Sequence, residues 1–474
     1  MKQITIDIET ASDENIKDCG VYRYAESEYF DLLLVSYAVD NGPVATCDIA
    51  NGETLPDDVR NALTDETVIK KAFHVNFERI CLSVYLRRRY PEMLDFEDST
   101  GSYLDPVSWQ CDMIHCRYLG MLSSLDDMGR LLRLKEKKMA EGKELIRFFC
   151  TLHQEADGSI LFHDKSDAPK KWEKFKAYNR RDVEVELKIQ RYLSEFPVPE
   201  FVWEEFFPIP ESEMELYRMD QEINDRGILV DTSFAKKAVE LDGQVKKALL
   251  PKLKELTGLD NPNSPVQMKE WLMCRDIETD TLDKKFMQKI SGSAPEEVQE
   301  VLRLYQQLSR SSVQKYTTML RVVCADGRAR GMFSFYGANR TGRFARRLIQ
   351  LQTLPQNHLD DLAELKEQIR TGEFDAIKEN YDDVPDVLSQ LIRTAFIPPE
   401  GKKYVVADFS AIEARVLAWL ADEKWRMQAF ANGEDIYCAS ASKMFGVPVE
   451  KNGTNGHLRQ KGKIAELACG YGGS

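Results

Sequence analysis

The stretch ITIDIE, residues 4–9, alternates apolar and polar side chains. Strict alternation predicts a half-buried β-strand, because successive side chains of a strand leave opposite faces of the sheet. Ile6 and Ile8 would then face a core, while Asp7 and Glu9 would project from the other face about 7 Å apart. Two adjacent carboxylates repel each other unless a cation lies between them, and oxygen ligands suit a divalent ion. Taken alone, the pair fits a solvated strand edge as well.

Working outward from this strand, residues 1–195 have the pattern of an α/β unit. A second strand-like run covers 32–39, and helical patterns cover 125–134 and 178–193. Four prolines at 197–210 then break the periodicity. The pattern that follows is helical and charged, and short strands return after residue 325. The strand-like run Tyr404–Asp408 precedes further helices. We therefore expect an α/β domain at 1–195, a linker at 196–212, helical segments at 213–325, a mixed α+β region at 326–425 and helices at 426–474.

Composition narrows the class of protein. The 474 residues are 43 % hydrophobic and 30 % charged, which is typical of a globular chain of more than one domain. No apolar run approaches the roughly 18 residues of a membrane helix. The net charge of −14 argues against a basic nucleic-acid coat protein. The ten cysteines are scattered singly, as reduced thiols of a cytoplasmic protein would be.

Three residues add to the acidic pair on the first strand. Tyr178 and Asp182 are four apart on an expected helix and so share one face, and Glu78 begins another helical pattern in FHVNFERICL. Each feature alone fits an ordinary solvated helix. In order, the set resembles the DEDD exonuclease superfamily, in its tyrosine-bearing branch. That resemblance implies that Asp7, Glu9 and Asp182 ligate two Mg²⁺ or Mn²⁺ ions, with Glu78 at the fourth acidic position and Tyr178 orienting the attacking water. His74 stands where an Asn is usual.

The segment YVVADFSAIEARVLAWLA, residues 404–421, delivers an acid from an expected strand directly into an expected helix. Asp and Ser are also good helix N-caps, so the pattern alone fits a structural cap equally well. The string closely resembles motif A of family A DNA polymerases. By that resemblance Asp408 binds the catalytic metal ions, Ser410 and Ile412 lie beside the triphosphate, and Glu413 closes the sugar pocket against a 2′-hydroxyl.

The last residues read HLRQKGKIAELACGYGGS, and four side chains recur there at every fourth position. On a helix they form a stripe about 18 Å long that runs from cationic to apolar to aromatic. An amphipathic surface helix would give the same stripe. The spacing matches motif B of the same family and implies a nucleotide-binding helix with Leu467 in place of the usual aromatic residue. The stripe consists of Arg459, Lys463, Leu467 and Tyr471.

The segment GANRTGRFARRLIQLQTLPQN, residues 337–357, contains four arginines within eight residues. Such a cluster favours phosphate or minor-groove contact, although a solvated basic loop is the alternative. The string is similar to a primer-template-binding element of the same polymerases, which implies that Arg343 and Gln352 contact the minor groove. The candidate DNA-binding residues are Arg340, Arg343, Arg346, Arg347 and Gln352.

Together these motifs make nearly the whole chain resemble a family A, DNA polymerase I-like enzyme of bacteriophage type. The implied fold is an RNase H-like three-layer α/β exonuclease domain followed by an α+β palm, a helical thumb and partial fingers. The implied partners are primer-template DNA and deoxynucleoside triphosphates, with two metal ions in each active site. The implied location is the cytoplasm of a bacterial host.

One motif of the family has no counterpart in these residues. Family A polymerases carry a second palm carboxylate in a His-Asp-Glu turn downstream of motif B, and that string does not occur here. We therefore expect polymerisation to need a C-terminal polymerase fragment. Two alternatives stay open: a stand-alone exonuclease whose 213–474 region grips DNA, and a non-catalytic assembly subunit of a split polymerase. Intact motifs A and B argue against the first.

Overall fold

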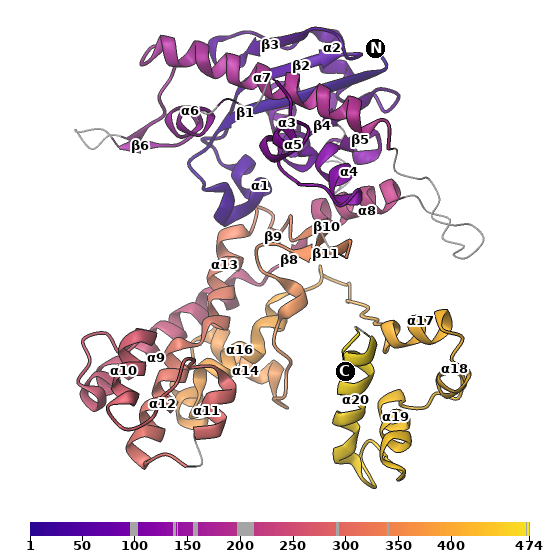
Figure 1. The fold of residues 1–474 in the computed structure, drawn as a ribbon. Coiled ribbons are helices and arrows are strands. Elements are labelled where there is room, and N and C mark those ends of the chain that lie inside the picture. The colour runs from indigo at the N-terminus through magenta and orange to yellow at the C-terminus, as the bar shows by residue number, and fades with distance from the viewer. Residues whose placement is uncertain are drawn as a thin grey trace. The chain divides into compact units, whose positions relative to one another are not determined.

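The protein is seen here as a computed structural model, shown in Figure 1, which describes all residues except 95–102, 136–138, 140, 155–159, 197–212, 291–292, 339–340, 471 and 474. Most of the expected linker at 196–212, together with Arg340 and Tyr471, therefore lies outside the described residues. The described chain forms two compact units, Met1–Pro399 and Glu400–Ser474. Motif A and the last helices thus fall in one unit, although we expected a boundary at 425.

The described secondary structure is mixed α/β. The strands are β1 (Gln3–Ala11), β2 (Asp31–Val39), β3 (Val44–Asp48), β4 (Ile69–Ala72), β5 (Trp109–Cys111), β6 (His153–Gln154), β7 (Ile160–Leu161), β8 (Ile228–Leu229), β9 (Arg328–Ala329), β10 (Phe333–Ala338) and β11 (Arg343–Arg346). The α-helices of the first unit are α1 (Ile16–Glu26), α2 (Asp57–Ala62), α3 (Val75–Arg89), α4 (Asp112–Tyr118), α5 (Leu125–Leu131), α6 (Gly142–Phe149), α7 (Pro169–Leu193), α8 (Glu213–Arg226), α9 (Thr232–Thr257), α10 (Pro265–Met273), α11 (Lys284–Ile290), α12 (Glu296–Ser309), α13 (Gln314–Val322), α14 (Leu362–Thr371), α15 (Phe374–Asn380) and α16 (Val384–Leu391). Those of the second unit are α17 (Ile412–Leu420), α18 (Lys424–Ala431), α19 (Ile436–Phe445) and α20 (Arg459–Gly470).

The strand expected from ITIDIE is the central strand of a five-stranded sheet with the order β3-β2-β1-β4-β5. β1 is antiparallel to β2, whereas β4 is parallel to β1 and β5 is parallel to β4. The isoleucines of β1 are buried in a core shared with α1, α2 and α3. The pairing of β1 with β2 shifts register between Glu9 and Thr10, and such a bulge re-aims the neighbouring side chains.

Helix α7 lies across the other face of this sheet (Figure 1). It begins with Pro169, whose fixed φ suits a first helical position. Trp172, Phe175 and Tyr178 recur at helical spacing and are buried in a second core that includes Leu34 of β2. The sheet with helices on both faces has the three layers that the family resemblance implied for this region.

The helical pattern expected after residue 213 is present as α8–α13. Two cores hold this part of the first unit together, one built on α9 with α13, α14 and α16, and one on α10, α11 and α12. Helix α9 is capped at both ends: the Asp231 side chain accepts from the Phe234 amide, and Gly258 takes the left-handed conformation that ends the helix. The described part of the chain contains no helix that is both long and apolar enough to cross a membrane.

The expected strand Tyr404–Asp408 is not a strand in the structure. The segment is extended but pairs with no strand among the described residues, and Val405 and Val406 remain 85 % and 90 % exposed. An apolar run forms a strand only where another strand satisfies its amides and carbonyls, and the described residues of its own unit, Glu400–Ser474, include no strand. Helix α17 then begins at Ile412, directly after Ala411 in the left-handed conformation (φ 50°).

Candidate active sites

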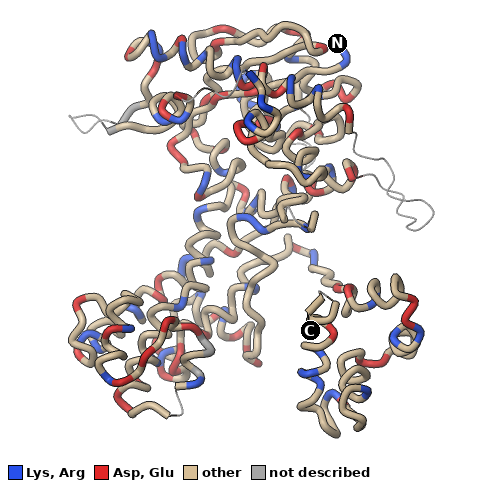
Figure 2. The backbone as a smooth tube through the Cα atoms, viewed as in Figure 1, with Lys and Arg blue, Asp and Glu red and all other residues tan. Residues whose placement is uncertain are grey.

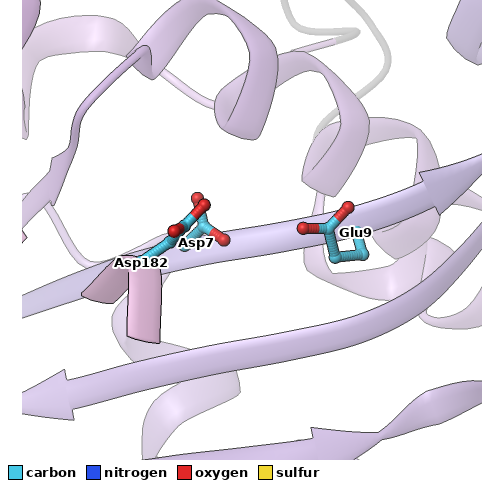
Figure 3. Close-up of side chains that lie close together, drawn as sticks. All are labelled: Asp7, Glu9 and Asp182. Atoms are coloured by element: carbon cyan, nitrogen blue, oxygen red, sulfur yellow. The ribbon is translucent and has the colours of Figure 1, made fainter. Parts of the chain in front are cut away.

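Three carboxylates meet above the central sheet. Asp7 and Glu9 extend from the same face of β1, and Asp182 reaches them from α7 (Figure 3). One oxygen from each lies within 4.8 Å of the others. Asp7 is half-buried, and Glu9 and Asp182 are only 8 % and 2 % exposed. Three carboxylates this close in a partly dry environment repel strongly, so the geometry favours a bound cation. An all-oxygen donor set suits Mg²⁺ or Mn²⁺.

Tyr178 lies one helical turn before Asp182 and is 1 % exposed. Burial, and then the charges of Glu9, Asp182 and Asp7, raise the pKa of its phenol above the ordinary value. A hydrogen bond to Asp182 contributes in the same direction, so the hydroxyl keeps its proton and can donate it in a hydrogen bond. The ring of Phe175 stacks on Tyr178 at 6.4 Å between centroids and fixes its plane.

A second group of acids lies close to the three. Gln190 donates through Nε2 to Asp112 Oδ2 at 2.7 Å and to Glu186 Oε1 at 3.0 Å, and Thr5 donates to Gln190 Oε1. Burial, and then the charge of Asp112, raise the pKa of Glu186 well above its ordinary value, with Asp7 adding to the shift. Burial also raises the pKa of Asp112. The pair therefore retains a proton, which limits the negative charge next to the metal-binding carboxylates.

Glu78 is not one of the three converging acids. It lies in the first turn of α3 and is 4 % exposed. Strand β4 is parallel to β1, and α3 begins shortly after the end of β4. The first turn of α3 therefore starts close to the same height along the sheet as Asp7 on β1. Glu78 also contributes to the raised pKa of Glu186, as Asp7 does. Glu78 therefore borders the acidic region, and its role there stays a prediction.

Two residues at this site had not been singled out from the sequence. Asn179 is fully buried and donates through Nδ2 to Asp7 Oδ2 at 2.6 Å, which fixes that carboxylate. The sequence could have indicated Asn179, because it lies three residues before Asp182 and therefore on the same face of the helix. Gly142 at the start of α6 touches the Tyr178 ring so closely that a Cβ atom there would lie 2.2 Å from Cε2. Only the tertiary structure reveals that contact.

The arginine cluster occupies the hairpin of β10 and β11 and the turn after it. Arg343 and Arg346 are exposed, as is Gln352 beyond them. Arg347 instead is half-buried and lines a small cavity with Asp220 and His74. Lysines and arginines are interspersed with acidic residues along the described chain (Figure 2), so the exposed arginines of this hairpin are a local feature.

The cavity beside Arg347 lies where α3, α4, α8 and β10 meet. Burial raises the pKa of Asp220 to about 6, although a hydrogen bond from Gln221 opposes the shift. Burial lowers the pKa of His74 to about 4, and the charges of Arg347 and Arg117 add to that effect. His74 is therefore neutral at physiological pH and cannot offset the charge of Asp220.

In the second unit the motif A residues are exposed. Asp408 lies in the segment before α17, Ser410 lies in the turn that follows this segment, and Ile412 and Glu413 begin α17. Arg415 turns back over this segment, donating through Nε to the Ser410 carbonyl at 2.9 Å. The guanidinium also lies 4.3 Å from the centre of the Phe430 ring, so it links motif A to α18.

Arg459, Lys463 and Leu467 of the expected nucleotide-binding stripe lie on α20, and Tyr471 lies outside the described residues. Arg459 is ion-paired with Asp435, the N-cap of α19, at 2.8 Å, whereas Lys463 is half-exposed and Leu467 is exposed. Gly462 allows α20 to pack directly on α19, because a Cβ atom there would lie 2.1 Å from the Tyr437 carbonyl oxygen. The stripe is thus held in place by α19.

Comparisons with known proteins bear on the family of this chain. The family described as DNA polymerase family A matches residues 233–474. A DNA polymerase of Bacillus phage SP02 is 44 % identical over 476 residues, which cover all of this chain and 70 % of the phage protein. DNA polymerase I of Borreliella burgdorferi is 27 % identical over 265 residues, covering 55 % of this chain and 26 % of that protein.

The fold resembles a solved structure of the POL domain of Pol1 from M. smegmatis in complex with DNA primer-template and dNTP. The TM-score is 0.59 at 18 % identity, over 99 % of this chain and 67 % of the other. At that identity the likeness concerns the fold alone. The family match and the phage relative establish the affiliation: this chain belongs to DNA polymerase family A.

Proposed function

We propose that residues 1–195 of this family A polymerase chain form a 3′→5′ proofreading exonuclease. The observation that carries the proposal is the convergence of Asp7, Glu9 and Asp182 within 4.8 Å, with the buried Tyr178 hydroxyl against Asp182. The three-layer arrangement around β1 is the one that an RNase H-like exonuclease fold would need.

The side chains divide the work of phosphodiester hydrolysis. Asp7, Glu9 and Asp182 would hold Mg²⁺ or Mn²⁺, which supplies charge neutralisation at the phosphate and acidifies the attacking water. Tyr178 keeps its proton and positions that water through its hydroxyl. Asn179 holds Asp7 in its rotamer through the 2.6 Å hydrogen bond. Glu78 would complete the acidic set from α3 and allow a second ion.

The experiment is degradation of a 5′-labelled single-stranded oligonucleotide in Mg²⁺. We expect shortening from the 3′ end with release of mononucleotides. Asp7→Ala should lower the rate by several orders of magnitude because a metal ligand is lost. Tyr178→Phe should cost less, because the phenol orients water without holding metal. Asp57→Ala, which removes an exposed carboxylate of the same region, is the control. Equal losses from Asp7→Ala and Tyr178→Phe would contradict the division of roles.

For polymerisation we propose that Asp408 is one palm carboxylate and that Ser410, Ile412, Glu413, Arg459, Lys463, Leu467 and Tyr471 bind the incoming deoxynucleoside triphosphate. Arg343, Arg346 and Gln352, with Arg340, would contact primer-template DNA. A second palm carboxylate is needed for two-metal chemistry, and we propose that a further polymerase segment supplies it.

Primer extension tests this second proposal. These 474 residues alone should extend a primer undetectably, and a C-terminal polymerase fragment carrying the His-Asp-Glu turn should restore extension. Asp408→Ala should abolish the restored activity while leaving the exonuclease intact. Robust incorporation by the 474 residues alone would contradict the proposal, because another acid would then have to complete the metal site.

A further inference from the structure

A deeply buried ion pair among the described residues of the first unit joins α3 to α8. Arg79 is 0 % exposed and Asp225 is 4 % exposed. The two terminal nitrogens of Arg79 donate to the two carboxylate oxygens of Asp225, Nη1 to Oδ2 at 2.8 Å and Nη2 to Oδ1 at 2.7 Å. This two-pronged geometry fixes the relative orientation of both groups more tightly than a single hydrogen bond would.

The pair is embedded in a network that crosses several segments. Tyr22 of α1 donates to Asp225 Oδ1 at 2.6 Å, and Arg79 Nη1 also donates to the Leu104 carbonyl at 2.7 Å. On the α8 side, Arg330 donates to the Asp225 carbonyl at 2.6 Å. The next residue back, Asn224, exchanges two hydrogen bonds with the backbone of Phe333 in β10. Asp225 is thus anchored to the chain that follows residue 213.

A buried charge is tolerated only when it is paired and its remaining donors are satisfied. The energetic consequence is asymmetric, since removing one partner leaves the other charge uncompensated in a dry interior. Removal of Asp225 would therefore leave the Arg79 charge uncompensated in the part of α3 that carries it. Arg79 directly follows Glu78, which lies in the first turn of α3.

We propose that the Arg79–Asp225 pair is a positioning device for Glu78, so that α8, which lies beyond residues 1–195, forms part of the exonuclease centre. Arg79 and Asp225 touch no reacting atom and act by fixing the first turn of α3 beside the metal-binding carboxylates. The inference rests on the proposed exonuclease function. It deepens that function by making metal binding at Asp7, Glu9 and Asp182 depend on a residue of α8.

The test is a titration of the 474-residue chain with Mn²⁺. Electron paramagnetic resonance measures the concentration of free Mn²⁺, and the bound fraction follows from it. Asp225→Asn keeps the size of the side chain but removes its charge. We expect the Mn²⁺ dissociation constant of the exonuclease site to rise about tenfold, the scale seen when a supporting partner of a metal site is lost. Glu78→Gln should give the same shift, and combining it with Asp225→Asn should add nothing further, because both act through one carboxylate.

The control is Lys366→Met, which breaks another partly buried ion pair, Lys366–Asp231 at 3.1 Å, away from α3. It should lower the melting temperature without changing Mn²⁺ affinity. Binding is measured at a temperature where circular dichroism shows each variant folded. If Asp225→Asn does not fold, Arg79→Lys takes its place, because it keeps the positive charge and loses the two-pronged hydrogen bond. Arg79→Lys should also raise the Mn²⁺ dissociation constant.

The outcomes separate this inference from the proposed function. If the wild type has no Mn²⁺ site that Asp7→Ala removes, the exonuclease centre itself is wrong. If that site exists but Asp225→Asn or Arg79→Lys binds Mn²⁺ as tightly as the wild type, the positioning role is refuted and the pair only stabilises the fold. Full additivity of Asp225→Asn and Glu78→Gln would also refute it.

Discussion

Replacing Gly142 with alanine should inactivate the proposed exonuclease without touching any of the proposed metal ligands. A Cβ atom at this position would lie 2.2 Å from Tyr178 Cε2, whereas carbon atoms in contact are about 3.5 Å apart, so the ring must move by roughly 1.3 Å. The ring has little room to do so, because Phe175 stacks on it and the residue is 1 % exposed. A displacement of about 1 Å at a reacting centre can cost about 100-fold in rate.

The assay is single-turnover digestion of a 5′-labelled oligonucleotide in Mg²⁺, together with Mn²⁺ affinity. We expect Gly142→Ala to lower the rate constant by about 100-fold while Mn²⁺ binds as in the wild type. Gly129→Ala is a matched control, because a Cβ atom at this helical position would meet Val185 Cγ1 at an ordinary 3.8 Å. If Gly142→Ala digests DNA at the wild-type rate, the position of Tyr178 does not limit the reaction.

Two further variants test the surroundings of the site. Asn179→Ala removes the hydrogen-bond donor to Asp7 Oδ2. We expect the Mg²⁺ concentration for half-maximal exonuclease activity to rise about tenfold. An unchanged Mg²⁺ concentration would mean that other contacts fix Asp7. Asp220 has its pKa raised to about 6 in the fold, so the folded state holds its proton more tightly and stability falls as pH rises from about 4 to about 6. Asp220→Asn should therefore raise the free energy of unfolding at pH 7. The gain is at most about 3 kcal/mol, and the loss of the attraction between Arg347 and the carboxylate reduces it. Near pH 4 the substitution should have little effect, because Asp220 is protonated there in the folded state. Urea unfolding at both pH values measures this, and an equal effect at both would exclude Asp220 as the titrating group.

Local sequence patterns predicted β1 and part of α7, because these elements depend on short-range periodicity. The alternation in residues 4–9 predicted β1, and the helical spacing before Leu193 predicted the second half of α7. Both patterns also assigned Asp7, Glu9 and Asp182 to faces that meet in the structure. The spacing of residues along each element was therefore enough to predict which side chains share a face.

Features that depend on contacts distant in sequence could not be predicted in this way. The run Tyr404–Asp408 has the composition of a strand, but the described residues of its unit, Glu400–Ser474, include no strand with which it could pair. Arg347 reads as part of a basic cluster, yet its side chain lines the cavity next to Asp220. The ion pair of Arg79 with Asp225 joins residues 146 positions apart, and no local pattern marks it.

Anomalous diffraction from crystals soaked in Mn²⁺ with a short single-stranded oligonucleotide tests the exonuclease centre most directly. The predicted result is an Mn²⁺ peak among the oxygens of Asp7, Glu9 and Asp182, with the 3′-terminal phosphodiester beside it and the Tyr178 hydroxyl within hydrogen-bonding distance of the bound water. The same soak of Asp7→Ala crystals should show no peak there. An oligonucleotide bound elsewhere, or full Mn²⁺ occupancy in the Asp7→Ala variant, would contradict the assignment of these three carboxylates as the exonuclease centre.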